Sequence, residues 1–151
     1  MRAVTLDPGE RRLGWALTAT GEPVLATDLG LRLPDGTRWA WPDVERVSWR
    51  RPVLLVVRVS ESEGSGPRVQ LELAQEESLA DVVRSQVTAS IAWTDHVRLA
   101  PSGGVRVVGR RRPGQDLLEW QLVFDAGTDA HDPQLRAQAE EIVLRARRTV
   151  G

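Results

Sequence analysis

The sequence contains no cysteine, which excludes disulfide bonds, thiolate metal sites and cysteine nucleophiles. It also contains no Lys, Asn or Tyr, so all 20 basic residues are Arg. Because Val, Ala, Gly and Pro are abundant as well, we interpret this bias as the mark of a GC-rich coding sequence rather than of a function. The longest strictly apolar run, residues 53–57, is far shorter than the roughly 20 residues that span a membrane.

A strong net charge of either sign is missing too. The formal net charge is −1, so no overall field attracts the chain to nucleic acid, and we expect no nucleic-acid partner. Hydrophobic residues make up 41% and charged residues 27% of the sequence, a composition typical of a folded domain. The length of 151 residues predicts a single compact domain over 1–151, and the shortness of the apolar runs predicts no transmembrane segment.

The N-terminal stretch MRAVTLDPGERR lacks the apolar centre of a secretory signal peptide. We therefore expect an unprocessed N-terminus and a cytoplasmic location, with peripheral association at the membrane as the alternative. Residues 1–12 are interpreted as a lead-in to the first strand, with a turn at Pro8-Gly9.

Short runs of alternating apolar residues begin at Leu13, and Gly, Pro and Asp separate them, a pattern typical of antiparallel strands. The turn Pro34-Asp35-Gly36 divides two of these runs. One run, 53–59, is apolar on both faces and is predicted to be a central strand. Residues 61–66 are predicted to be a polar loop. The predicted strands are 13–17, 24–27, 31–33, 39–41, 44–49, 53–59 and 68–73.

Two helices are predicted where the apolar spacing changes to about 3.6 residues. Ser78 and Asp81 have the pattern of a capping box at the start of the first helix. An apolar stripe predicts the buried side of this helix and an end near Trp93. The stripe consists of Leu79, Val82, Val83, Val87 and Ile91. Asp132-Pro133 predicts the start of a C-terminal helix, because Asp is a good N-cap and Pro fits the first helical position. A β-hairpin of 105–110 and 118–124 is predicted between the two helices.

The segments LGWALTATGEPVLATDLGLRLPDG and RWAWPDVERVSW resemble the beginning of bacterial PH-like and GRAM-type domains. In that family a strand ending in Thr is followed by a short apolar strand, a turn, and an aromatic or aliphatic segment. The resemblance covers roughly residues 10–93. The matching residues are Val24, Leu25, Thr27, Leu31, Leu33, Trp41, Pro42, Asp43, Val44 and Val47.

The resemblance implies an α+β fold with a PH-like bent antiparallel sheet or partly open barrel. About seven short strands would form this PH/GRAM-like core over 10–93, capped by the helix that starts at Ser78. Residues 97–151 depart from the family pattern. We expect them to form an extension, consisting of the hairpin and the C-terminal helix, that packs on the core. Whether this extension lies against the finished core or completes its barrel stays open.

Three Trp residues gather in the stretch that resembles the family. Trp39, Trp41 and Trp49 lie at alternating positions, where a sheet buries its inner face, so we interpret them as scaffold. The alternative is an exposed aromatic binding cluster.

Arg residues at two strand ends form the best candidate for binding an anionic group. Arg50 and Arg51 lie at one end, and Arg110, Arg111 and Arg112 lie at a hairpin turn. The guanidinium group matches phosphate geometry, and the resemblance implies lipid binding by basic loops at the open end of the sheet. The alternative is that these Arg residues only keep exposed turns soluble.

Catalytic and metal-binding motifs are weak in this sequence. The segment from Asp125 to Asp132 holds three carboxylates and His131, which are suitable ligands for a metal, but Asp132 is also the predicted helix cap. His96 is the only other histidine. No phosphate-binding loop or dinucleotide fingerprint is present, so we assign no catalytic residue and expect no cofactor.

We therefore expect a non-catalytic PH/GRAM-like interaction module that binds a protein partner or its own copy through a sheet edge or a loop end. Binding of anionic lipid through the Arg-rich turns is one alternative. A small metal-dependent enzyme that uses the Asp125–Asp132 segment is the other.

Overall fold

The computed structural model describes residues 4–59, 66–74 and 78–150, so most of the loop predicted at 61–66 lies outside the described residues. The chain divides into two compact units, unit 1 (Met1–Ala89) and unit 2 (Ser90–Gly151), and each is described by itself. Within the described residues both units are α+β, with antiparallel strands and one α-helix each. In the described part of the chain no helix is both long and apolar enough to cross a bilayer.

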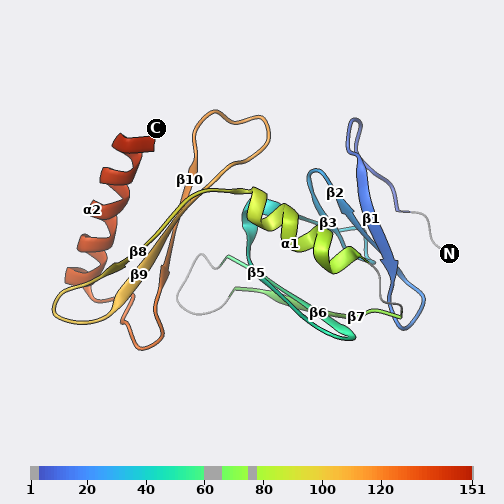
Figure 1. Cartoon of the computed structure of the whole chain (residues 1–151), viewed down its shortest axis with the longest axis horizontal. Helices are drawn as coiled ribbons and strands as arrows, with labels where there is room; N and C mark the ends of the chain where they lie inside the picture. Colours follow the sequence, from blue (N-terminus) through green and yellow to red (C-terminus); the bar gives the residue numbers. More distant parts are fainter. Residues whose placement is uncertain (1–3, 60–65, 75–77, 151) are drawn as a thin grey trace. The chain divides into compact units, whose positions relative to one another are not determined.

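Unit 1 contains two antiparallel sheets and the helix α1 (Leu79–Ala89), which runs across them in Figure 1. The first sheet has the strand order β1-β2-β3-β4 and the second the order β5-β6-β7. A short 3-10 helix, η1 (Trp41–Asp43), links them. The strands are β1 (Arg12–Leu17), β2 (Pro23–Thr27), β3 (Gly30–Arg32), β4 (Arg38–Ala40), β5 (Val44–Arg50), β6 (Val53–Arg58) and β7 (Arg68–Glu72).

The predicted turn at Pro34-Asp35-Gly36 is confirmed between β3 and β4. Gly36 has a φ of 88°, a value that glycine adopts without strain. The Asp35 carboxylate accepts a hydrogen bond of 2.9 Å from the backbone N–H of Thr37, which closes the turn. The turn therefore sets the register in which Leu31 pairs with Trp39.

The two sheets of unit 1 meet at one corner, where Thr18 forms an isolated antiparallel bridge with Leu73. The N–H of Ala19 donates to the carbonyl of Glu72 at 2.7 Å, and the N–H of Ala74 donates to the carbonyl of Leu17 at 3.0 Å. The strands are otherwise grouped into separate open sheets, so the described residues form no closed barrel.

The core of unit 1 lies between these sheets and α1. Leu79, Val83 and Val87 of the predicted stripe are buried, and Val82 packs partly against the same core. Burial of each such side chain contributes about 1.5–3 kcal/mol before entropy is subtracted. The helix begins directly after Ser78, whose carbonyl accepts the N–H of Val82 at 3.0 Å.

The predicted end of α1 near Trp93 is wrong, because the helix ends at Ala89 and residues 91–98 form the strand β8 (Ile91–Arg98). Ile91 continues the helical stripe by spacing, but residues 91–97 are also rich in β-branched and aromatic side chains, which suit a strand. The carbonyl of Ser90 accepts a hydrogen bond of 2.7 Å from the N–H of Arg111, so the chain enters a sheet directly after the helix.

Unit 2 is a three-stranded antiparallel sheet with the order β10-β9-β8, covered on one face by a helix. It adds β9 (Gly104–Arg110), β10 (Glu119–Phe124) and α2 (Pro133–Val150) to β8. The predicted hairpin is confirmed as β9 and β10, and β8 is a third strand of the same sheet that was not predicted. Whether 97–151 packs on the residues before it stays a prediction.

The sequence signals for α2 are confirmed. The Asp132 carboxylate accepts a hydrogen bond of 2.9 Å from the N–H of Gln134, and Pro133 is the first helical residue. One side of the helix packs on the sheet. The buried residues of this second core are Leu99, Val105, Val107, Leu135 and Ala139, with Trp120, Leu122, Phe124, Ile142 and Val143 partly buried against them.

Candidate functional site

The predicted Arg site is distributed over both units, since Arg50 and Arg51 belong to unit 1 and the triplet Arg110 to Arg112 belongs to unit 2. Arg50 and Arg51 are exposed at the end of β5. Arg110 is only 2% exposed, because its side chain lies within unit 2. Its Nε donates to the Gln121 side-chain carbonyl at 2.9 Å, and its Nη1 donates to the Ser90 hydroxyl at 2.9 Å.

Arg112 forms a bidentate pair with Glu119 across the β9–β10 connection. Its Nε lies 2.6 Å from one carboxylate oxygen and its Nη2 lies 2.9 Å from the other. These hydrogen bonds lower the pKa of Glu119, against the opposing effect of its partial burial. Arg111 is exposed. Two of the three guanidinium groups in the predicted triplet therefore take part in the internal structure of unit 2.

The predicted scaffold role of the indoles is confirmed for Trp39 and Trp41, which are buried in the core of unit 1, and Trp49 is half-buried against it. The Trp41 Nε1–H donates to the carbonyl of Thr27 at 2.8 Å, so its polar edge is satisfied. The guanidinium carbon of Arg58 lies 5.4 Å from the Trp39 ring centroid, a cation–π contact.

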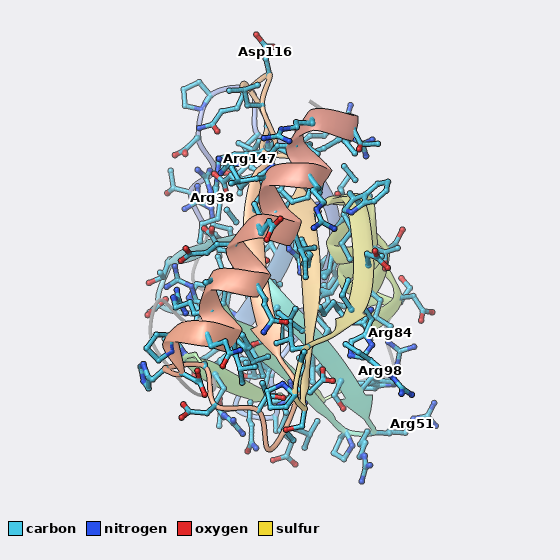
Figure 2. The ribbon with its side chains drawn as sticks, turned by 90° about the vertical axis from the view of Figure 1, so that its left-hand side faces the viewer. Arg38, Arg51, Arg84, Arg98, Asp116 and Arg147 are labelled. Carbon is cyan, nitrogen blue, oxygen red and sulfur yellow. The ribbon has the colours of Figure 1, made fainter. Side chains whose placement is uncertain are left out.

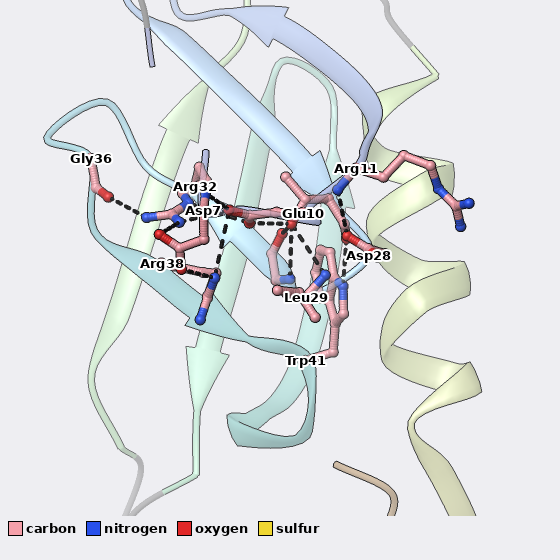
Figure 3. A network of polar contacts seen from close by, with 11 residues as sticks. Asp7, Glu10, Arg11, Asp28, Leu29, Arg32, Gly36, Arg38 and Trp41 are labelled. Carbon is pink, nitrogen blue, oxygen red and sulfur yellow. Dashed lines mark hydrogen bonds and ion pairs between the residues drawn. The ribbon is translucent and has the colours of Figure 1, made fainter. Parts of the chain in front are cut away.

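A buried polar network at the N-terminal segment was missed by sequence reasoning, which treated residues 1–12 as a lead-in. The Glu10 side chain is fully buried and accepts a hydrogen bond of 2.7 Å from Nη2 of Arg32. The Thr27 hydroxyl donates to the other carboxylate oxygen at 2.6 Å. Figure 3 shows Arg38 reaching Asp7 on the same side, at 2.8 Å.

The charges of this network are matched. Burial raises the pKa of Glu10, but hydrogen bonds from Arg32, Thr27 and the N–H of Asp7 outweigh it and lower the pKa to about 2. The same carboxylate raises the pKa of Arg32. A carboxylate that stays ionised and hydrogen-bonded holds the segment before β1 in place. It is poorly suited to general acid–base chemistry, which requires a group that gains and loses a proton near neutral pH. The sequence signal was an acidic residue just after the turn at Pro8-Gly9.

Side chains of the acidic segment from Asp125 to Asp132 form hydrogen bonds within turns and a contact with His96. Asp125 lies 2.7 Å from Nε2 of His96, which comes from β8 on the other edge of the sheet. Gly104 of the middle strand lies between them, and a Cβ there would collide with the Asp125 carboxylate. The Asp129 carboxylate accepts the N–H of His131 at 2.9 Å. Among the described residues, no group of three His, Cys, Asp or Glu side chains lies close enough to hold a metal ion.

An open groove of about 320 Å³ lies between the edge strand β10 and α2, and we call it the α2 groove. Its apolar wall consists of Trp120, Leu122 and Val143, and Leu144 beside them is 51% exposed. Glu140 and Arg147 complete the lining. In Figure 2 the helix faces the viewer, with Arg147 labelled near its C-terminal end.

Sequence reasoning missed this groove, although it predicted the helix that forms it. The apolar spacing of the C-terminal helix predicts a buried stripe that leaves out Leu144 and consists of Leu135, Ala139, Ile142, Val143 and Ala146. A large apolar residue that lies off the buried stripe, between charged residues, is the signal that could have identified it.

Comparison of the chain with protein-family models, with curated proteins and with solved structures gave no match. The geometry of the two units is therefore the basis for the functional proposal.

Proposed function

We propose that the chain is a non-catalytic PH/GRAM-like interaction module that binds a protein partner through the α2 groove of unit 2. The order of elements in unit 1 supports the type of module. Four strands of one sheet, three strands of a second sheet and a helix follow one another, as the resemblance of residues 10–93 implies. PH-like character is a proposal about unit 1, and the binding site is a proposal about unit 2.

The observation that carries the proposed binding site is the exposure of Leu144 beside an apolar groove. Protein interfaces combine an apolar centre, often with an aromatic residue, and a polar rim. Here the indole of Trp120 and the side chain of Leu122 supply the centre, and Glu140 and Arg147 supply charges of both signs. The groove is at the small end of the roughly 300–1,000 Å³ typical of ligand pockets. It is also open, so it is suited to a protruding side chain of a partner.

The strand β10 adds a second reason to place the interface here. Among the residues that the structure describes it pairs with β9 alone, so it is an edge strand whose other side has backbone groups that face away from this sheet. Partner segments often bind at such an edge while their side chains enter neighbouring pockets. The internal hydrogen bonds of Arg110 and Arg112 favour this protein-binding proposal over lipid binding at the β9–β10 turn.

The test compares the full chain with its Leu144→Glu variant, and with Leu117→Glu as the matched control. Leu117 is 72% exposed and does not line the groove. Each of the three chains is immobilised and incubated with a cell lysate. A protein that binds to wild type and to Leu117→Glu, but not to Leu144→Glu, is then purified and titrated against the full chain by calorimetry. We expect saturable binding that Leu144→Glu weakens about tenfold or more.

Equal retention by all three chains would contradict a binding role for the α2 groove. Co-sedimentation with vesicles of phosphatidylcholine, with and without phosphatidylserine, examines the lipid alternative. Binding that requires phosphatidylserine and is lost in Arg111→Ala, while Leu144→Glu binds normally, would replace the present proposal with the lipid one.

A further inference from the structure

We propose that the occupant of the α2 groove is a second copy of this chain, with the two α2 helices packed antiparallel about a two-fold axis near Leu144. This inference rests on the proposed function and names its partner. The reason is the order of charges along the exposed side of α2.

Three residues define that side next to the groove. Glu140, Leu144 and Arg147 occupy positions i, i+4 and i+7 of α2, so they lie along one side of the helix. With a rise of about 1.5 Å per residue, Glu140 lies about 6 Å before Leu144 and Arg147 about 4.5 Å after it. An exposed apolar side chain is therefore flanked by an acid and a base at nearly equal distances.

An antiparallel partner reverses this order. A two-fold axis near Leu144 places Glu140 of each copy opposite Arg147 of the other, so the rotation creates each ion pair twice. A parallel partner in the same register would instead place Glu140 against Glu140 and Arg147 against Arg147. The antiparallel arrangement also places the positive end of each helix dipole beside the negative end of the other. Glu140 and Arg147 are thus complementary to the same residues of a second copy in the antiparallel orientation and not in the parallel one.

The next residues repeat the pattern on the other side of Leu144. Glu141 precedes it and Arg148 follows it, so the same rotation also brings these two close to each other. Within one chain, Arg145 pairs with Glu141 at 3.1 Å and Arg136 with Glu140 at 3.6 Å, and both pairs are largely exposed. Exposed pairs at this spacing contribute little to stability, so the acids can exchange these partners for the second copy at small cost.

The apolar part of the contact follows from the groove. Leu144 of one copy enters the α2 groove of the other, against Trp120 and Leu122, while the charged residues form the rim. Each Leu144 loses its exposure, and each groove is filled. A contact made by one 18-residue helix from each copy buries little surface compared with the roughly 1,200–2,000 Å² that stable interfaces bury. The dimer is therefore weak, concentration-dependent and sensitive to salt.

Charge-reversal variants of the full chain test this arrangement by sedimentation equilibrium over a wide range of protein concentration. In the proposed dimer of Glu140→Arg, the Arg introduced at position 140 of each copy faces Arg147 of the other. In the dimer of Arg147→Glu, the Glu introduced at position 147 of each copy faces Glu140 of the other. We expect each variant alone to dimerise about tenfold or more weakly than wild type.

An equimolar mixture of the two variants restores opposite charges at both contacts. The Arg introduced in the first variant faces the Glu introduced in the second, and the unchanged Arg147 of the first faces the unchanged Glu140 of the second. We therefore expect the mixture to regain the wild-type affinity within about threefold.

Leu144→Glu should abolish the dimer, and Leu117→Glu should dimerise like wild type. Circular dichroism and thermal melting of each variant show that it is folded. A monomeric wild type, or a mixture no tighter than its single variants, overturns the antiparallel pair.

The two proposals fail differently. A monomeric wild type that binds another purified protein in a Leu144-dependent way overturns the second copy as occupant and leaves the proposed function standing. If Leu144→Glu changes neither self-association nor the binding of another protein, the proposed function and the antiparallel pair are both overturned.

Discussion

Glu10 and Arg32 form a buried ion pair, with 2.7 Å between Oε1 and Nη2, that joins the segment before β1 to the strand β3. The acid is fully buried and the base is 11% exposed, so water screens the pair poorly. Thr27 and Asp7 complete the hydrogen bonds of the carboxylate. This relationship makes the N-terminal segment part of the folded unit and leads to two predictions about its stability.

Glu10→Gln should destabilise unit 1 by about 3 kcal/mol, because it leaves the Arg32 charge buried without its main partner. Asp7, 3.4 Å from Arg32, keeps the loss at the lower end of the range for buried pairs. Urea unfolding followed by tryptophan fluorescence measures the change. The control is Glu72→Gln, an exposed residue of the same unit, which should shift the free energy of unfolding by less than about 0.5 kcal/mol. Equal effects of the two substitutions would contradict a stabilising role of the pair.

The same pair predicts how stability depends on pH. The pKa of Glu10 is about 2 in the folded chain, below its ordinary value of 4.5, so the unfolded chain takes up this proton first as pH falls. The stabilisation, on the order of 3 kcal/mol, is complete above about pH 4.5 and is lost progressively towards pH 2. Unfolding measured at several pH values should show this loss in wild type and a smaller one in Glu10→Gln. Identical profiles for both chains would count against it.

Gly104 should be required for the contact between His96 and Asp125. A Cβ at this position would meet the Asp125 carboxylate, which is the end of a partly exposed side chain that can turn away, so Gly104→Ala should break the contact with His96 and lower the free energy of unfolding by about 1 kcal/mol. Removing the carboxylate removes the clash, and the same substitution should cost clearly less in an Asp125→Ala background. A double-mutant cycle by thermal unfolding gives this difference. Strictly additive effects would show that the clash is not the cause.

Arg110 and Arg111 should differ in their contributions, although they are neighbours of the same type. Arg110→Ala removes a buried guanidinium group that donates to the Gln121 and Ser90 side chains, and it should cost about 2–4 kcal/mol. Arg111→Ala, at an exposed position, should change the free energy of unfolding by less than about 0.5 kcal/mol. Chemical denaturation of both variants measures the contrast. A larger loss for Arg111→Ala would reverse the structural assignment.

Local signals in the sequence were sufficient for most elements. The turn at Gly36 and the helix start at Asp132 depend on backbone geometry that a few residues determine, and both are confirmed. The seven strands before Ser78 were predicted within a residue or two of their observed ends. Ile91 shows where spacing fails, because it fits the helical stripe and the strand equally well, and only its pairing in the sheet decides.

The candidate sites depended on contacts between distant residues, which sequence spacing does not reveal. Arg110 belongs to a run of three Arg residues at a turn, yet Gln121, eleven positions later, binds its side chain. Glu10 is paired with a residue 22 positions away. The α2 groove requires Trp120 of a strand and Leu144 of a helix to lie together, which follows from the packing of α2 on the sheet.

The absence of cysteine from the chain allows the most direct test of self-association through α2. A single cysteine in Leu144→Cys lies near the proposed two-fold axis, whereas in Ala137→Cys, an exposed position of the same helix, it lies about 10 Å from the axis in each copy. Under mild oxidation we expect Leu144→Cys to form a disulfide-linked dimer at least about tenfold faster than Ala137→Cys. Equal rates for the two variants would contradict the antiparallel pairing of α2.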